Sequence, residues 1–537
     1  MTTPPIAKDQ QRTRENVRSP ALSLGWIVLL IGLAFALVLA LPGQTVTTKY
    51  VNDLFIFLDG AYRIVEGQVP NRDFHSSLGP LAFYLPAFGY ALTGSLGAAM
   101  PLGMALATVF LALIAAQVIG SRMRPITGIP LAVFLLLIAA VPLNPGEGIG
   151  DLSFAMFYNR LGWTALGLLL VMYLPPRDPG FQRPVLDAGC SAAITLFLVY
   201  LKISYGVVAI AFILFMLTDR TARSWAAMAL LGGVAAVLLI EAIWGGTLTY
   251  LADVKLASNV SGDLPDLQRL TTIVLHNLAD IAVALVFAAI LLLVRRSWRD
   301  LLFLGFCGAT GILIIEQNFQ IVGILSLAAG AAVTAELLAA HWPRKGLHLG
   351  LPLLLAILML PVTAQNGLGL ILHTGLALTQ QGDDFTLPGL AGVRLVQVTN
   401  EGLYRNFSRY NRSLAEGALA LSALDTEIER VVVFDFVSPF TAGLGLAPPS
   451  GDSPWYHWGR TLDDDMYPPA EDILADAKII MEPKWPVEVW TARGMSRVYA
   501  GYLAAHFTLA NETADWRVYV RRAETTNVTR QSTSAQP

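Results

Sequence analysis

Long apolar runs constrain this chain more than any other feature of its sequence. Hydrophobic residues make up 55% of its 537 residues and charged residues only 14%, which is far from the balance of a soluble protein. Apolar runs long enough to cross a bilayer recur along the chain up to about residue 363. We therefore predict a mainly α-helical, polytopic membrane protein with about eleven transmembrane helices. The runs cover residues 21–41, 98–119, 126–142, 156–174, 185–201, 203–218, 225–243, 279–294, 301–315, 320–340 and 347–363.

Charge and cysteine content exclude several classes of protein. The formal net charge is only −3, and no basic patch or acidic tail suggests nucleic acid as a partner. Cys190 and Cys307 both lie inside apolar runs, so we expect no disulfide framework. The first apolar run can span the bilayer and has no small-residue cleavage pattern behind it, so we expect it to remain as the first span.

Basic residues occur in every second connection between the apolar runs. Because short loops that carry Lys and Arg resist translocation, this alternation predicts a cytoplasmic N-terminus and an extracytoplasmic C-terminus. We expect the protein in the inner (plasma) membrane of a bacterium, with its C-terminal domain in the periplasm or otherwise outside. The basic connections carry Arg12, Arg14 and Arg18; Arg122 and Arg124; Arg177 and Arg183; Arg220 and Arg223; Arg295, Arg296 and Arg299; Arg344 and Lys345.

A nearly continuous apolar stretch, residues 184–219, lies between two of these basic connections. At about 1.5 Å per residue it is too long for one span. We therefore predict two short helices that meet near Lys202, which places Lys202 at the outer face.

The chain divides into four parts. Residues 1–20 form a cytoplasmic tail, and residues 21–365 form the transmembrane domain, whose outer loop at residues 43–97 carries the candidate site. Residues 366–525 alternate between helical and strand patterns, which predicts a small extracytoplasmic α/β domain. Residues 526–537 are polar, and we expect them to be disordered. Within the α/β domain we predict helices at residues 397–424 and 488–504 and strands at residues 430–436, 477–481 and 516–520.

The first outer loop is dense in charged and aromatic residues for so apolar a protein. Asn52 and Asp53 precede an apolar-periodic stretch that ends at Gly67 and Pro70. This pattern predicts a helix that lies on the membrane surface, with Asp53 at or near its N-terminus. An ordinary helix cap explains Asp53 equally well on this pattern alone.

The order of features in this region is distinctive. A first span is followed by an acidic residue, an amphipathic helix, a Gly-x-x-Pro turn, an Asp-Phe pair and a Gly-Pro-Leu start of the next apolar helix. This order resembles the GT-C superfamily, integral membrane glycosyltransferases that use polyprenyl-phosphate sugars and include the protein mannosyltransferases and the aminoarabinose transferases of lipid A. The topology is similar along the whole chain, whereas the motifs are confined to its first third. The matching residues are Asp53, Gly67, Pro70, Asp73, Phe74, Gly79, Pro80 and Leu81.

The resemblance implies an enzyme that moves a sugar from a polyprenyl-phosphate donor to a lipid, glycan or protein acceptor. It implies Asp53 as the catalytic base, with Asp73 as a second candidate catalytic residue. A carboxylate within hydrogen-bond reach can take the proton of an acceptor hydroxyl as the new bond forms. Such a single displacement inverts the anomeric centre.

A polyprenyl-phosphate leaving group needs cations at the outer membrane boundary. Two of the candidates, Arg160 and Lys202, lie at the outer ends of predicted spans. A single Arg or Lys at such a position more often only extends its charged end to the membrane interface. The family commonly has a Lys before a Pro pair, whereas this chain has His-Ser-Ser-Leu at residues 75–78 before Gly79 and Pro80. The candidates for binding the donor phosphate are Arg72, His75, Arg160 and Lys202.

The second outer loop offers two acids, Glu147 and Asp151. Together with Asp53 or Asp73 they could hold a divalent ion, and carboxylate oxygens suit Mg²⁺ or Mn²⁺. Solvated loop acids beside Gly-rich turns are the alternative. No His or Cys cluster in the sequence has the spacing of a zinc site.

Aromatic residues gather in the tail from Trp455 to Trp458, including His457. Aromatic rings stack on sugar rings, and we expect the tail to lie over the membrane cavity, although packing within the domain explains this run at least as well.

Two other classes of function remain open. A transporter or flippase of lipid-linked sugars would also be polytopic, but the sequence shows no related halves with broken helices near the midplane. A non-catalytic cell-envelope scaffold would leave Asp53 dispensable.

Overall fold

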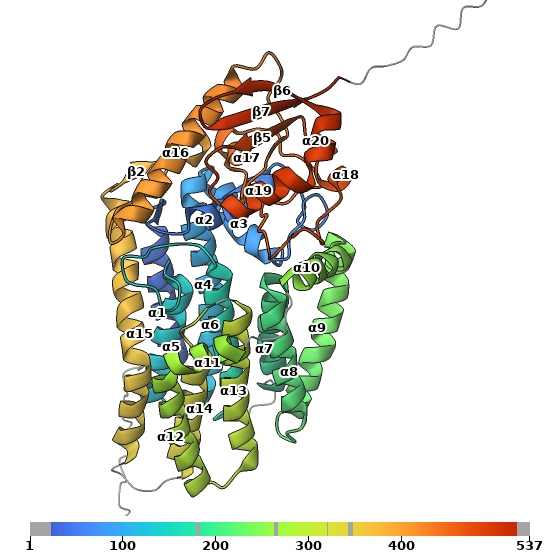
Figure 1. Ribbon diagram of the computed structural model, residues 1–537. Helices are drawn as coiled ribbons and strands as arrows, with labels where there is room; N and C mark the ends of the chain where they lie inside the picture. The colour runs from blue at the N-terminus through green and yellow to red at the C-terminus, as the bar shows by residue number, and fades with distance from the viewer. Residues whose placement is uncertain (1–22, 179–182, 262–266, 319, 342–346, 524–537) are drawn as a thin grey trace, which may run out of the picture.

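The computed structural model describes residues 23–178, 183–261, 267–318, 320–341 and 347–523. In these residues a bundle of long helices carries a small α/β domain at one end, as Figure 1 shows. The predicted class, mainly α with a small C-terminal α/β domain, is therefore confirmed.

Each apolar run that we predicted as a span contains a helix. By length and composition, five helices of the described residues could cross a membrane, or six if α11 (Leu267–His276) and α12 form one bent span. Shorter apolar helices complete the bundle, and the count of about eleven spans stays a prediction. The helices in these runs are α1 (Leu24–Ala40), α4 (Leu96–Arg122), α5 (Pro125–Ala140), α6 (Phe157–Val171), α7 (Arg183–Leu201), α8 (Ile203–Leu217), α9 (Arg223–Trp244), α12 (Leu278–Val294), α13 (Trp298–Gln317), α14 (Leu325–His341) and α15 (Leu347–Leu378).

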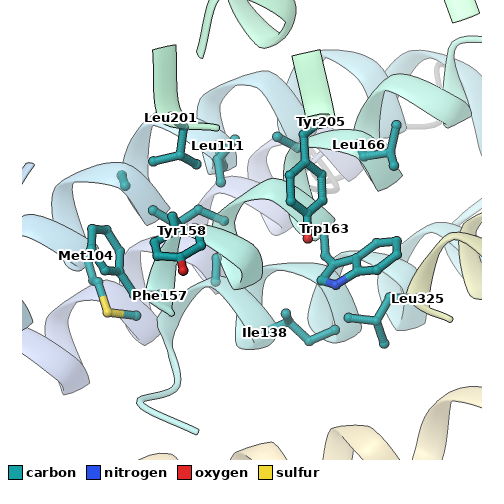
Figure 2. Close-up of a cluster of buried hydrophobic side chains, with 14 of the residues drawn as sticks. Met104, Leu111, Ile138, Phe157, Tyr158, Trp163, Leu166, Leu201, Tyr205 and Leu325 are labelled. Atoms are coloured by element: carbon teal, nitrogen blue, oxygen red, sulfur yellow. The ribbon is translucent and has the colours of Figure 1, made fainter. Parts of the chain in front are cut away.

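The core of the bundle lies around α6, all of whose residues are buried. By contrast, α9 buries only four of its residues, as expected of a helix whose apolar side chains face lipid. Figure 2 shows the aromatic part of the core, where the Trp163 and Tyr205 rings meet edge to face with their centroids 5.6 Å apart. Tyr158 lies in the same cluster. Packing on all sides fixes the side chains that α6 carries.

The predicted break at Lys202 is confirmed. α7 ends at Leu201, α8 begins at Ile203, and Lys202 between them has an extended backbone. Its N–H still donates to the Leu198 carbonyl oxygen at 2.9 Å. The break therefore turns the chain sharply while it leaves the end of α7 hydrogen-bonded.

α15 is longer than we predicted. It continues to Leu378, past residue 365, where we expected the C-terminal domain to begin. We expected the tail to begin at about Asn366, but Asn366 is buried in the helix. A Cβ added to Gly369 would lie 3.2 Å from the Leu143 side chain. The small residues therefore allow close packing of the helix rather than ending it.

The helix that we predicted on the membrane surface is instead buried. α2 runs from Val51 to Val65, and every residue from Leu54 to Arg63 is buried. The bundle helix α4 lies on one side of it and the C-terminal domain on the other. Tyr62, for example, donates its hydroxyl to the Leu446 carbonyl oxygen at 3.1 Å. The surface prediction failed because the apolar residues of α2 pack against protein on two sides.

The first outer loop and the tail share a sheet. Strand β1 (Thr45–Thr47) of the loop pairs in parallel with β3 (Val393–Leu395) of the tail, and β2 (Asp383–Asp384) pairs antiparallel with β3. Helix α3 (Leu81–Thr93) continues the loop back into the bundle. The loop is thus held between the two parts of the protein.

A second sheet forms the centre of the C-terminal domain, with strand order β4-β5-β7-β6. The three predicted strands correspond to β4, β5 and β7, whereas β6 was not predicted because four of its six residues are exposed and show no clean apolar alternation. The elements are η1 (Pro388–Leu390), α16 (Glu401–Ser422), β4 (Val431–Val433), α17 (Pro439–Leu444), α18 (Ala470–Ile473), β5 (Ile479–Pro483), α19 (Val489–Val498), α20 (Ala500–His506), β6 (Phe507–Glu512) and β7 (Trp516–Arg521).

Arg-bearing connections meet at the end of the bundle opposite the C-terminal domain (Figure 1). Arg299, at the start of α13, lies 3.3 Å from Asp219 after α8. The Arg177 N–H donates to the Ser121 carbonyl oxygen at 2.9 Å. This grouping agrees with the alternation of basic connections, while the side of the membrane on which this end lies stays a prediction.

Candidate functional site

A cavity of about 530 Å³ opens where the first outer loop, the helix bundle and the C-terminal domain meet. Asp53 and Ser77 reach it from the loop, and Lys202 and Tyr158 from the bundle. Helix α10 (Thr247–Ser261), between the bundle and the domain in Figure 1, forms another wall. The C-terminal domain closes the cavity with residues between Trp455 and Arg460. Two of the residues predicted from sequence, Asp53 and Lys202, therefore lie on one cavity.

Asp53 lies in the first turn of α2, two residues after Val51. The N-cap residue is Tyr50, whose φ of 55° is left-handed and whose side chain makes no cap hydrogen bond. Asp53 is therefore not the helix cap, and it lines the cavity instead. Burial raises the pKa of Asp53 to about 7, against the opposing charge of Arg460. A carboxylate with such a pKa suits a general base at neutral pH.

Lys202 reaches the cavity from the break between α7 and α8. Its ammonium donates to the Asn318 side-chain oxygen at the end of α13. Asn318 in turn donates to the Tyr205 hydroxyl at 3.3 Å. An ammonium has three N–H donors, so this anchor orients Lys202 and leaves it able to bind an anion in the cavity.

Arg460 brings a second cation to the cavity from the C-terminal domain. Burial lowers the pKa of Arg460, while the neighbouring Tyr158 and Asp53 raise it. Our sequence reasoning missed this residue, as it missed Tyr158. No local pattern marks Arg460, because the tertiary fold alone brings it beside Asp53.

The other predicted phosphate-binding residues lie outside this cavity. Arg160 is fully buried in α6 and donates to the Asn144 side-chain oxygen at 2.6 Å and to the Ala155 carbonyl oxygen at 3.1 Å. Arg72 is exposed and donates to the Trp244 carbonyl oxygen at 3.2 Å. The structure thus gives both arginines a protein partner.

His75 lies on a smaller neighbouring hollow of about 50 Å³. Its Nδ1 is 3.0 Å from the Asp253 carboxylate of α10, and this hydrogen bond raises the pKa of His75. The contact fastens α10 to the first outer loop.

The second predicted catalytic acid, Asp73, does not line the cavity. Its carboxylate accepts a hydrogen bond from the Val69 N–H at 2.7 Å. Its backbone oxygen accepts from the Gly451 N–H, also at 2.7 Å. These contacts hold the turn before α3 against the C-terminal domain.

The two acids proposed for a metal each have protein partners. Glu147 is paired with Lys49 and accepts from the Tyr50 hydroxyl at 2.8 Å. Asp151 accepts from the Gly148 N–H at 3.2 Å and from the Thr399 hydroxyl at 3.3 Å. Within the described residues no three His, Cys, Asp or Glu side chains are grouped to hold a metal ion. The metal role of this pair stays a prediction.

Comparisons with known proteins include two solved structures that this chain resembles in fold. The chain is similar over 92% of its length to 97% of ArnT from Cupriavidus metallidurans, with 15% identity and a TM-score of 0.44. It is similar over 85% of its length to 68% of the oligosaccharyltransferase from Archaeoglobus fulgidus, with 12% identity and a TM-score of 0.36. No family model and no curated protein matches the sequence.

Proposed function

We propose that this chain is an integral membrane glycosyltransferase. It transfers a sugar from a polyprenyl-phosphate donor to a hydroxyl of a lipid, glycan or protein acceptor on the extracytoplasmic face, with inversion. The observation that carries the proposal is that Asp53 and Lys202 line one cavity at the junction of the bundle and the C-terminal domain. The resemblance of the first outer loop to GT-C transferases supports the same reaction.

The chemistry divides between the acid and the cations. The acceptor oxygen attacks the anomeric carbon, and Asp53 takes its proton. The bond from that carbon to the phosphate oxygen breaks, and its electron pair stays on the phosphate, so the configuration at the carbon inverts. Lys202 stabilises the charge that develops on the phosphate, and Arg460 favours the charged form of Asp53. In this assignment Asp73, Arg72 and Arg160 hold the surrounding structure.

The place of the cavity suits a lipid-linked donor. Lys202 lies at the ends of α7 and α8, two apolar helices of the bundle. A polyprenyl chain stays in the hydrocarbon layer while its phosphate lies at the interface. The donor can therefore reach Lys202 without leaving the bilayer.

The test is transfer by the purified full chain in lipid nanodiscs, with a panel of radiolabelled polyprenyl-phosphate sugars. We expect Asp53→Asn to lose at least about 100-fold in rate, because general-base catalysis typically contributes about 10²–10⁴. Asp464→Asn is the matched control, since Asp464 is 63% exposed and pairs with Arg497 at the surface.

Each other outcome has a definite meaning. Full activity of Asp53→Asn removes Asp53 from the base role. Transfer from no donor favours a transporter or flippase of lipid-linked sugars, or a scaffold. Labelling of a cysteine at position 53 only from the cell interior contradicts the proposed face.

A further inference from the structure

The wall that the C-terminal domain gives to the cavity carries three rings, Phe436, Trp455 and His457. The Phe436 centroid lies 6.3 Å from that of Trp455 and 5.1 Å from that of His457, and the last two are 6.0 Å apart. All three pairs are close to edge-to-face, at 62–65°. The rings therefore form one rigid aromatic surface on the cavity.

Backbone contacts hold this surface in place. The Tyr456 N–H donates to the Phe436 carbonyl oxygen at 3.0 Å, which ties the segment to the loop after β4. The Trp455 N–H donates to the Ser453 hydroxyl at 3.1 Å, and the His457 N–H to the Thr461 hydroxyl at 2.8 Å. The rings are thus presented by a braced turn.

Two polar ring atoms on this surface are unsatisfied. Among the described residues, Trp455 Nε1 and His457 Nδ1 are both buried and have no hydrogen-bond partner. A buried polar atom without a partner costs about 1–3 kcal/mol. Both nitrogens are covered by protein atoms in this structure, so a ligand that pairs with them must displace the atoms that cover them, and it then supplies hydrogen bonds as well as an apolar face.

A sugar ring meets both needs. Its C–H face packs on an aromatic ring, and its hydroxyls both donate and accept hydrogen bonds. An indole N–H needs an acceptor. Burial and the charge of Arg460 lower the pKa of His457 to about 4, so its imidazole is neutral at pH 7 and can accept from or donate to a hydroxyl. An acyl chain would leave both nitrogens unpaired.

The surface lies on the acceptor side of the proposed reaction. Arg460, three residues after His457, is close enough to Asp53 for each charge to shift the pKa of the other. A ring bound on Trp455 and His457 is therefore a neighbour of the carboxylate that takes the acceptor proton. The donor phosphate is assigned to Lys202, on the bundle side of the same cavity.

We infer that Trp455 and His457 form an acceptor subsite for a carbohydrate, so that the proposed transferase extends a glycan rather than modifying a peptide side chain or a bare lipid. The acceptor role of this subsite rests on the proposed function. Sugar binding at the subsite does not, because it can be measured without a donor. A free oligosaccharide and the sugar head of a glycolipid offer the same chemistry.

The first experiment measures binding without a donor. The full chain in nanodiscs is titrated with free tetrasaccharides of glucose, galactose, mannose and arabinose units, and with the same sugars on a lipid anchor, by calorimetry. We expect binding of at least one member, weakened about tenfold by Trp455→Phe, which keeps a ring and removes the N–H. Trp485→Phe is the control, because Trp485 is 61% exposed and does not line the cavity.

Paired substitutions at His457 separate binding from folding. Asn places a polar atom near the position of Nδ1, so His457→Asn should retain more affinity than His457→Phe, which offers none. In transfer assays, Trp455→Phe should raise the KM for the acceptor and leave the KM for the donor unchanged.

The outcomes distinguish the subsite from the transferase. Sugar binding that depends on Trp455, without transfer from any donor, keeps the subsite and removes the proposed function. Transfer with the same acceptor KM in wild type, Trp455→Phe and His457→Phe removes the subsite and keeps the function. Binding of no sugar, or transfer to a peptide alone, overturns the inference. Binding only to the lipid-anchored sugars identifies a glycolipid as the source.

Discussion

The ammonium of Lys202 lies 5.0 Å from the centre of the Tyr158 ring, so a cation from the break between α7 and α8 rests over an aromatic side chain of α6. Such a contact holds an ammonium in place without neutralising its charge. The Asn318 oxygen holds the same ammonium from α13. Side chains from α6 and from the end of α13 thus hold the Lys202 ammonium at the cavity.

Substitution of Lys202 tests its role toward the donor. Hydrogen bonds to charged groups contribute about 1.5–3 kcal/mol, so Lys202→Met should raise the donor KM or lower kcat/KM about 10–100-fold. Lys202→Arg keeps the charge and should lose less. Lys484→Met is the control, because Lys484 pairs at the surface with Glu512 at 3.0 Å. An unchanged kcat/KM in Lys202→Met contradicts phosphate binding by this residue.

The pH profile of transfer reports on Asp53. A base must be deprotonated, and the pKa of Asp53 is raised to about 7, so kcat/KM should fall as the pH drops below about 7, tenfold per unit. Arg460 favours the charged carboxylate of Asp53. Arg460→Gln should therefore raise the pKa of Asp53 and move the acidic fall of kcat/KM to higher pH. Rates of wild type and variant between pH 5 and 9 measure the midpoint. If wild type and Arg460→Gln have the same midpoint, Arg460 does not influence the pKa of the base.

A buried ion-pair network joins α2 to the C-terminal domain. Arg63 binds Asp452 through two hydrogen bonds of 2.6 and 3.0 Å and also donates to Asp59 at 2.7 Å. Removal of one partner leaves a buried charge, so Asp452→Ala should cost about 3–5 kcal/mol and lower the melting temperature.

The exposed pair of Arg497 and Asp464 is the comparison for this network. Asp464→Ala should change stability by less than about 1 kcal/mol. Equal melting temperatures of the Asp452 and Asp464 variants would show that the network does not hold α2 and the domain together.

Gly79 tests how closely the first outer loop must approach the break at Lys202. A Cβ at this position would lie 2.0 Å from the Tyr200 carbonyl oxygen, and the Gly79 N–H donates to the Leu201 oxygen at 3.2 Å. Gly79→Ala must move the loop or the end of α7. We expect a loss of at least about 1–3 kcal/mol of stability and a raised donor KM.

The control for this substitution lies in α7 itself. Gly189 is inside the helix with open space around it, so Gly189→Ala should be neutral or stabilising by up to about 1 kcal/mol. Thermal unfolding of both variants in the same lipid gives the comparison. If Gly79→Ala melts like wild type, the close approach is not required.

The bundle could be predicted from sequence because bilayer length and apolar composition act residue by residue along the chain. The same local logic located the break at Lys202 and the strands β4, β5 and β7. The local pattern placed Asp53 at the start of a helix, and the resemblance to the GT-C superfamily then singled it out as the candidate base. Each of these features is visible within about twenty consecutive residues.

The tertiary structure alone decided which of the candidate residues meet. Lys202 joins Asp53 on the cavity, whereas Arg160 points to Asn144 and Asp73 to Val69 N–H. α2 is buried rather than on the surface because the C-terminal domain covers it, and that domain also brings Arg460 to Asp53. The contacts of α2 and Asp53 with the C-terminal domain join residues hundreds of positions apart, and no local pattern of hydrophobicity or charge encodes such pairings.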